Sequence, residues 1–173
     1  AETYWIVDGL DGTVNYSREI PLSCVSIGLI VNGISTVGVI YDYVHEEMFT
    51  GIVGLGSFLN GVPIQVNDNT DVSKALLLTA LSTKLEFSSR SLFEFVQGLD
   101  QWRKVRMLGT AALSMAYVAA GRADACQIKN IMFWDVAAGI AIVNAAGGRV
   151  VTEFSESNTL DINADNGVLK AVV

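Results

Sequence analysis

Two aspartates near the start of the chain, Asp8 and Asp11, are separated by two residues and follow a short apolar stretch. Together with the backbone carbonyl of Leu10, they can direct three hard oxygen atoms at one point. Mg²⁺ favours such ligands, usually one or two carboxylates combined with water and phosphate oxygens. Gly12 and Thr13 follow, and their backbone N–H groups lie at a turn where an anion can dock. The pattern indicates a metal site beside an anion site.

A simpler interpretation makes Asp8 and Asp11 ordinary turn residues, because Asp bonds readily to nearby backbone. The stretch before them, residues 4–7, is aromatic and β-branched and predicts a short buried strand. A turn that leaves a core strand and leads into Gly-Thr favours the metal interpretation without excluding the simpler one.

Two later segments place a polar residue where a helix is expected to begin. Asp135 precedes an apolar helical stripe and would be a good N-cap; alternatively its carboxylate also reaches a metal, and spacing alone does not choose. In Gly109-Thr110-Ala111 a strand turns into a helix, so free N–H groups could hold a substrate oxygen. Taken alone, Thr110 is better explained as a helix cap.

The first half of the chain is expected to form an antiparallel meander that carries the aspartate pair. Strands are predicted at residues 4–7, 23–31, 35–42, 46–52 and 57–66. Asn32-Gly33 and Asn60-Gly61 indicate tight hairpin turns, because type I′ turns need positive φ at both central positions.

The second half alternates between strands and helices. Strands are predicted at 75–81, 104–108 and 149–154, and helices at 89–99, from Thr110 to about Ala120, and from Asp135 to Gly147-Gly148. Strands followed by alternating helices and strands predict a layered α/β sandwich. We expect one domain over residues 1–173, with a metal-binding turn and meander in 1–72 and an α/β half in 73–173.

The composition narrows the classes of partner. The 173 residues carry a net charge of −7, so neither nucleic acid nor an anionic membrane is an expected partner. An acidic protein that handles phosphate needs local positive charge, which bound cations supply most simply. Cys24 and Cys126 lie in apolar stretches and suit a reducing cytosol. The only histidine, His45, lies in a polar turn and is a poor candidate for a catalytic base.

Two long motifs resemble the signatures of the inositol monophosphatase family. Residues 5–16 read WIVDGLDGTVNY and residues 133–150 read FWDVAAGIAIVNAAGGRV. Residues 105–124, VRMLGTAALSMAYVAAGRAD, resemble the stretch that precedes the second signature in that family. The likeness covers nearly the whole chain.

This resemblance implies an αβαβα sandwich of the inositol monophosphatase and fructose-1,6-bisphosphatase type, and a homodimeric, Li⁺-sensitive, Mg²⁺-dependent enzyme, while the two cysteines indicate a cytoplasmic location. Such an enzyme hydrolyses a small phosphate monoester with metal-activated water. The site residues that it implies are the metal ligands Asp8, Leu10, Asp11 and Asp135; Asp11 and Thr13 as catalytic residues, with the Thr13 hydroxyl positioning the water; Gly12 and Thr13 at the phosphate; and Gly109, Thr110 and Ala111 beside the alcohol.

Three departures from the family pattern bear on activity. Gly9 replaces the usual proline, which leaves the turn less rigid. The family places a glutamate ligand well upstream of the first signature, but only seven residues precede Asp8. We therefore expect an N-terminal segment to be missing, and low or no turnover from residues 1–173 alone. Ile128 stands where several relatives carry an acid that contacts substrate hydroxyls.

Inositol monophosphate is the leading substrate, and fructose-1,6-bisphosphate, histidinol phosphate and 3′-phosphoadenosine 5′-phosphate are alternatives used by relatives. An alternative of another class is a non-catalytic relative kept for assembly. The three intact acids favour the enzyme.

Overall fold

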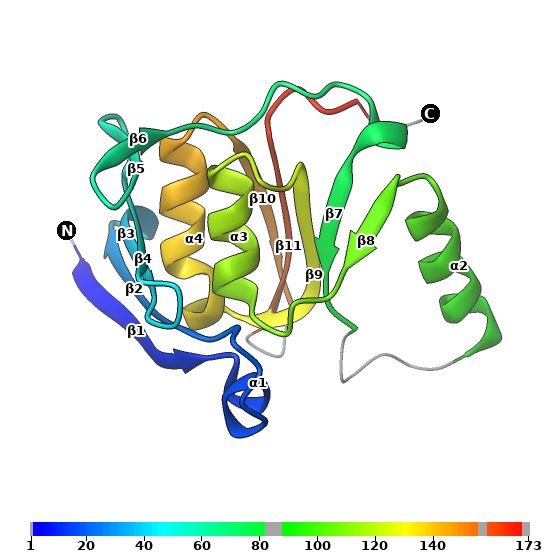
Figure 1. The fold of residues 1–173 in the computed structure, drawn as a ribbon, viewed down its shortest axis with the longest axis horizontal. Coiled ribbons are helices and arrows are strands. Elements are labelled where there is room, and N and C mark those ends of the chain that lie inside the picture. The colour runs from blue at the N-terminus through cyan, green and yellow to red at the C-terminus, as the bar shows by residue number, and fades with distance from the viewer. Residues whose placement is uncertain (1, 82–87, 156–158, 171–173) are drawn as a thin grey trace.

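A computed structural model describes residues 2–81, 88–155 and 159–170. Two sheets enclose a pair of helices, and one further helix lies against the outer face of the second sheet (Figure 1). These are four successive layers of the predicted αβαβα sandwich. Over the described residues, no helix layer covers the outer face of the first sheet.

The first sheet is an antiparallel meander whose strands pair in chain order. Its strands are β1 (Thr3–Asp11), β2 (Cys24–Val31), β3 (Ile34–Asp42), β4 (Glu47–Ile52), β5 (Gly56–Leu59) and β6 (Val62–Ile64). A short helix, α1 (Thr13–Ser17), lies between β1 and β2. The β2–β3 turn has positive φ at Asn32 and Gly33, 52° and 78°, and Asn60-Gly61 behaves alike, so both predicted tight turns are confirmed.

The second sheet has the order β10-β11-β9-β7-β8. Its strands are β7 (Leu76–Thr79), β8 (Lys104–Arg106), β9 (Ala125–Met132), β10 (Arg149–Phe154) and β11 (Thr159–Asp165). β7 runs parallel to both of its neighbours, β8 and β9, whereas β11 runs antiparallel to β9 and β10. β9 is the central strand of this sheet, although no strand was predicted over its residues.

Three helices belong to this second part: α2 (Ser89–Asp100), α3 (Ala111–Ala119) and α4 (Phe133–Ala145), with a 3₁₀ turn, η1 (Val72–Lys74), before β7. Helices α3 and α4 form the layer between the sheets, and 8 of the 9 residues of α3 and 7 of the 13 residues of α4 are buried. α2 is the helix on the outer face of the second sheet. No helix in the described ranges is both long and apolar enough to cross a membrane. The division of the domain near residue 72 stays a prediction.

A row of small residues lets α4 lie directly on the first sheet. Gly28, Gly38 and Gly51 are paired side by side across β2, β3 and β4, and Ser57 continues the row on β5. A Cβ added at Gly38 would stand 2.2 Å from the carbonyl oxygen of Ala138, so no larger residue fits beneath the helix. The Ser57 hydroxyl donates a hydrogen bond of 2.7 Å to the α4 backbone. The small residues of the sheet thus set the distance between α4 and the sheet.

Candidate functional site

A β-bulge directs both aspartates of the first motif to the same face of the first sheet. Asp8 pairs with Ser26 and Asp11 pairs with Cys24, so three steps along β1 correspond to two along β2. In a regular strand, residues three apart point to opposite faces, and one extra residue restores the same face. Ser26 and Cys24 are buried towards the helix layer, and both aspartates share that side. Residues 8–11 are therefore a bulged strand, which corrects the predicted turn.

The start of α3 holds the carboxylate of Asp11. Its Oδ2 accepts a hydrogen bond of 2.5 Å from the Thr110 hydroxyl and one of 2.7 Å from the Ala112 N–H. Thr110 is also the N-cap of α3, since its Oγ1 accepts from the Leu113 N–H at 3.3 Å. Burial raises the pKa of Asp11, the bonds from Thr110 and Ala112 oppose that rise, and the charge of Asp8 adds to it. Asp11 is thus a buried carboxylate in a fixed orientation.

Asp135 lies in the first turn of α4 and does not cap it. The helix begins at Phe133, and its N-cap is Met132, which makes no side-chain capping bond. The N-cap interpretation of Asp135 is therefore wrong, because the two aromatic residues before it are already helical. Burial, the charges of Asp11 and Asp8 and a side-chain hydrogen bond with Asp8 together raise the pKa of Asp135 to about 7.

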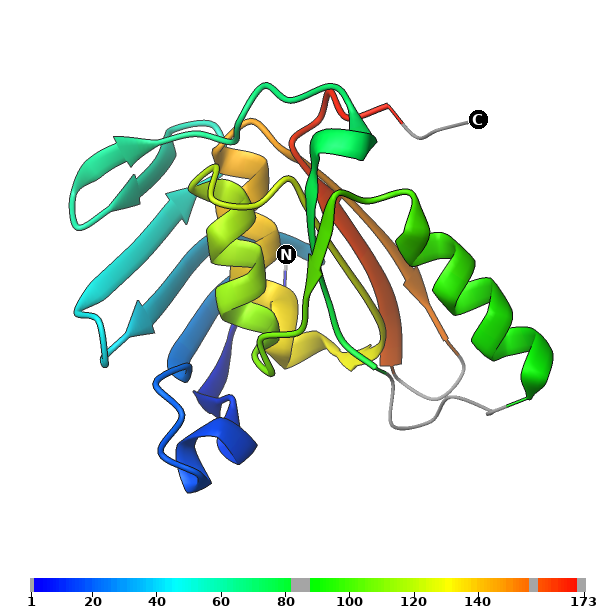
Figure 2. The same cartoon turned by 45° about the vertical axis from the view of Figure 1, so that its right-hand side comes forward.

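The three carboxylates thus approach one another from β1 and α4, at the end of the molecule where α1 lies and where α3 and α4 both begin (Figures 1 and 2). Within the described ranges, no group of three or more His, Cys, Asp or Glu side chains is arranged so that it could hold a metal ion by itself. The donors nevertheless fit a divalent cation such as Mg²⁺, because they are hard carboxylate oxygens whose mutual repulsion a cation would relieve.

The bulge also positions Leu10 and leads into the predicted phosphate segment. The Leu10 N–H donates to Asp8 Oδ1 at 3.1 Å, which fixes one side of that carboxylate. Gly12 has φ of 82° and precedes α1, and a Cβ there would stand 2.7 Å from the Leu22 carbonyl oxygen. A glycine is therefore required at this position. Thr13 is the exposed first residue of α1.

Asn15 is a positioning residue to which sequence reasoning gave no role. Its buried side-chain amide donates to the carbonyl oxygens of Leu22, at 2.9 Å, and Leu108, at 2.7 Å. Gly109, with φ of 75°, packs on this amide, and a Cβ there would stand 2.9 Å from it. The Asn in the first signature motif was the available signal. Asn15 joins the loop after β1 to the loop before α3.

The three residues expected beside the alcohol are therefore not equally available to a ligand. Thr110 and Ala111 are buried, and the Thr110 hydroxyl is bonded to Asp11. Gly109 is exposed and lies beside Asn15. Their role at the substrate stays a prediction.

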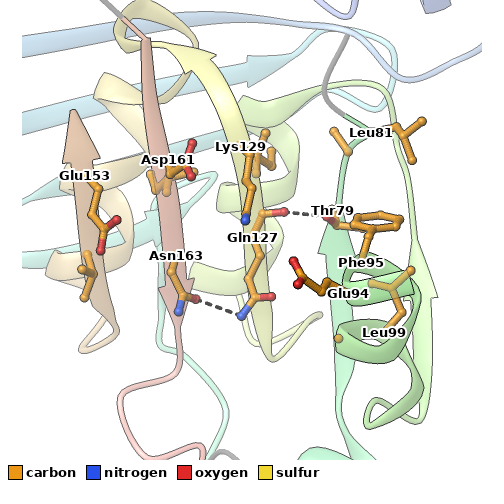
Figure 3. A pocket seen from close by; sticks show the side chains of 15 residues that line it. Thr79, Leu81, Glu94, Phe95, Leu99, Gln127, Lys129, Glu153, Asp161 and Asn163 are labelled. Atoms are coloured by element: carbon orange, nitrogen blue, oxygen red, sulfur yellow. Dashed lines mark hydrogen bonds between the residues drawn. The ribbon is translucent and has the colours of Figure 1, made fainter. Parts of the chain in front are cut away.

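A cavity of about 570 Å³ lies away from the carboxylates, between α2 and the outer face of the second sheet (Figure 3). Phe95 and Leu99 of α2 face Gln127 and Lys129 of β9 across it. Ile128 is buried and also belongs to its lining. None of the three aspartates lines this cavity, so the candidate chemistry lies elsewhere.

His45 does not join the carboxylate site. It lies in the turn between β3 and β4, about half of its side chain is exposed, and its Nδ1 is 2.8 Å from Oδ2 of the buried Asp42. This agrees with its assignment as a turn residue.

Comparison with known proteins completes the description. An inositol monophosphatase of Mesembryanthemum crystallinum is 43% identical over 152 residues, which cover 86% of this chain and 56% of that protein. A Nus factor SuhB of Xylella fastidiosa is 43% identical over 147 residues, covering 84% of this chain and 54% of that protein. The chain thus spans about half the length of such curated relatives.

The fold is likewise similar to that of a solved inositol monophosphatase. The inositol monophosphatase from Anabaena (Nostoc) sp. PCC 7120 is 40% identical and superposes with a TM-score of 0.89 over 98% of this chain and 70% of its own. The sequence profile of the inositol monophosphatase family matches residues 1–171. This chain belongs to the inositol monophosphatase family.

Proposed function

We propose that this chain is the carboxylate-bearing part of a Mg²⁺-dependent phosphatase that hydrolyses a small phosphate monoester, with inositol monophosphate as the leading substrate. The observation that carries the proposal is the approach of Asp8 and Asp11 to Asp135, whose pKa is raised to about 7 by burial and then by the charges of those two acids. Repulsion of this kind, at a donor set of hard oxygens, is what a divalent cation offsets.

In this proposal Asp8, Asp11, Asp135 and the Leu10 carbonyl hold Mg²⁺. Bound Mg²⁺ would neutralise phosphate charge and make a water molecule more acidic. Thr110 and Ala112 keep Asp11 in one orientation throughout. Since phosphoryl transfer depends mainly on positioning and charge, such a pre-set carboxylate reduces the reorganisation needed during reaction.

The remaining roles concern the substrate. Gly12 and Thr13 bind the phosphate through backbone N–H groups, and the Thr13 hydroxyl orients the attacking water. Gly109, Thr110 and Ala111 border the alcohol. Inhibition by Li⁺, homodimeric assembly and a cytoplasmic location belong to the same proposal.

The test is phosphate release by the full-length protein from inositol monophosphate, fructose-1,6-bisphosphate, histidinol phosphate and 3′-phosphoadenosine 5′-phosphate, with and without Mg²⁺ and Li⁺. We expect Mg²⁺-dependent release, fastest from inositol monophosphate. Asp135→Asn should lower kcat/KM by more than about 100-fold, since even outer-shell partners of metals typically contribute 10- to 100-fold. Asp100→Asn, an exposed acid at the end of α2, is the matched control.

Two results would count against the proposal. Equal activity of the Asp135→Asn and Asp100→Asn proteins would remove Asp135 from the site. Absence of Mg²⁺-dependent release from all four substrates, in a protein that is folded, would favour the non-catalytic alternative.

A further inference from the structure

Ser26 is buried beside the carboxylates with its hydrogen-bonding capacity unused. Its side chain is 1% exposed, and its Oγ has no hydrogen-bond partner among the described residues. Buried hydroxyls in folded proteins are almost always bonded, because an unpaired one loses its interaction with water without compensation. An exception at the edge of a candidate metal centre therefore needs an explanation.

The strand register places Ser26 directly opposite Asp8. The two residues are paired across β1 and β2, and side chains of directly opposed residues lie on the same face with Cβ atoms about 4.5–5.5 Å apart. On the other side Ser26 is paired with Ile40, which is apolar. Of its two cross-strand neighbours, only Asp8 can accept a hydrogen bond from the hydroxyl.

The neighbours along β2 place Ser26 beneath the start of α4. Gly28, two residues after Ser26, lies under Ala137 and Ala138. Cys24, two residues before Ser26, has its Sγ 3.9 Å from the Thr110 hydroxyl, and its pKa is raised first by burial and then by the charges of Asp11, Asp42 and Asp8. Ser26 therefore belongs to the floor of the space in which the aspartates approach one another.

We propose that Ser26 is a positioning residue of the metal centre, whose hydroxyl, unpaired in this structure, donates a hydrogen bond to the Asp8 carboxylate when Mg²⁺ is bound and holds it in its cation-binding orientation. Leu10 N–H already binds Asp8 Oδ1 from one side, and Ser26 would restrain the carboxylate from the sheet below. This inference rests on the proposed function, since it assumes that Asp8 is a metal ligand. Hydrogen-bond partners of metal-binding carboxylates typically contribute 10- to 100-fold to metal affinity.

The test compares Ser26→Ala with Ser57→Ala in the full-length protein, by Mg²⁺ titration calorimetry and by urea unfolding with and without Mg²⁺. Ser26→Ala should raise the Mg²⁺ Kd about 10- to 100-fold. Without Mg²⁺ its unfolding midpoint should be unchanged or higher, because the hydroxyl it removes is unpaired. Ser57→Ala removes an equally buried hydroxyl that is bonded to Ile142. It should lower the midpoint equally with and without Mg²⁺ and leave the Kd unchanged.

Ser26→Thr retains the donor and should bind Mg²⁺ with a Kd close to that of the unmodified protein. The proposal is overturned if Ser26→Ala binds Mg²⁺ as tightly as the unmodified protein, or if it is too unstable to titrate, which would show a structural role. Asp135→Asn separates the two proposals. If it weakens Mg²⁺ binding and Ser26→Ala does not, only the role of Ser26 fails. If the unmodified protein binds no Mg²⁺, both fail.

Discussion

Thr110 donates its hydroxyl to the carboxylate of Asp11 across 99 residues of sequence, at 2.5 Å. The same oxygen of Thr110 caps α3, so one side chain begins a helix of the middle layer and orients an acid of the first sheet. The stability of α3 and the geometry of the candidate metal centre are therefore coupled.

Replacement of Thr110 by valine should weaken both the capping of α3 and the restraint on the Asp11 carboxylate. Thr110→Val keeps the shape but removes the cap and a bond to a buried carboxylate, and we expect a loss of about 1–3 kcal/mol in the free energy of unfolding. Thr110→Ser retains the hydroxyl and should unfold near the normal urea concentration. Equal midpoints for the two variants would show that the hydroxyl contributes nothing.

The raised pKa of Asp135 predicts how stability depends on pH in the absence of metal. The folded chain binds this proton more tightly than the unfolded chain, so the stabilisation is complete below the ordinary pKa of 3.8 and is lost as pH rises through about 7. Asp135→Asn should therefore stabilise the Mg²⁺-free protein more at pH 8 than at pH 5. Urea unfolding at both pH values checks this, and an Asp135→Asn effect independent of pH would contradict it.

The glycine row beneath α4 predicts a severe effect of one added methyl group. Gly38→Ala would bring a Cβ within 2.2 Å of the Ala138 carbonyl oxygen. Overpacking typically costs about 1–3 kcal/mol or more. The control is Gly98→Ala in α2, where an added Cβ meets nothing within 4 Å and helix propensity should add about 0.5–1 kcal/mol. Thermal unfolding should shift in opposite directions for the two variants.

Gly9, which replaces the usual proline of the family motif, should be replaceable. An added Cβ there meets nothing within 4 Å, and its φ is not in the left-handed region. Gly9→Ala should raise the free energy of unfolding by about 0.4–1 kcal/mol, chiefly by restricting the unfolded chain. Gly12→Ala, with φ of 82° and a contact at 2.7 Å, should lower it. If both variants are destabilised in urea, Gly9 has a conformational role that its geometry does not reveal.

The sequence predicted the hairpins and the helices because their signals are local. Asn32-Gly33 fixes its own turn, and Thr110 was identified as a cap that the structure confirms. It did not predict β9, whose polar Gln127, Lys129 and Asn130 resemble a surface segment, although the strand lies between β7 and β11. Its position in the sheet depends on pairing with distant strands, which short patterns do not encode.

The distinction between local signals and contacts of distant segments also applies to the candidate site. The motifs identified Asp8, Asp11 and Asp135 by spacing and resemblance. The sequence did not predict two features of the site. The first is the bulge, because Asp and Gly are also turn residues. The second is the start of α4 at Phe133, because aromatic residues are weak helix signals. The bond between Thr110 and Asp11 and the unpaired hydroxyl of Ser26 appear only once distant segments are packed together.

The bulge in β1 also determines where the chain can change in length. Loss of a single residue between Trp5 and Asp8 would invert the alternation of everything before it and turn Trp5 inward, whereas loss of one between Asp8 and Asp11 would only convert the bulge into a regular strand in which both aspartates still share a face. A residue gained or lost at the hairpin tips, Asn32-Gly33 and Asn60-Gly61, would not change the face to which the residues of β1 point. Natural length variation in relatives of this chain should therefore gather at those tips and spare residues 5–8 of the first strand.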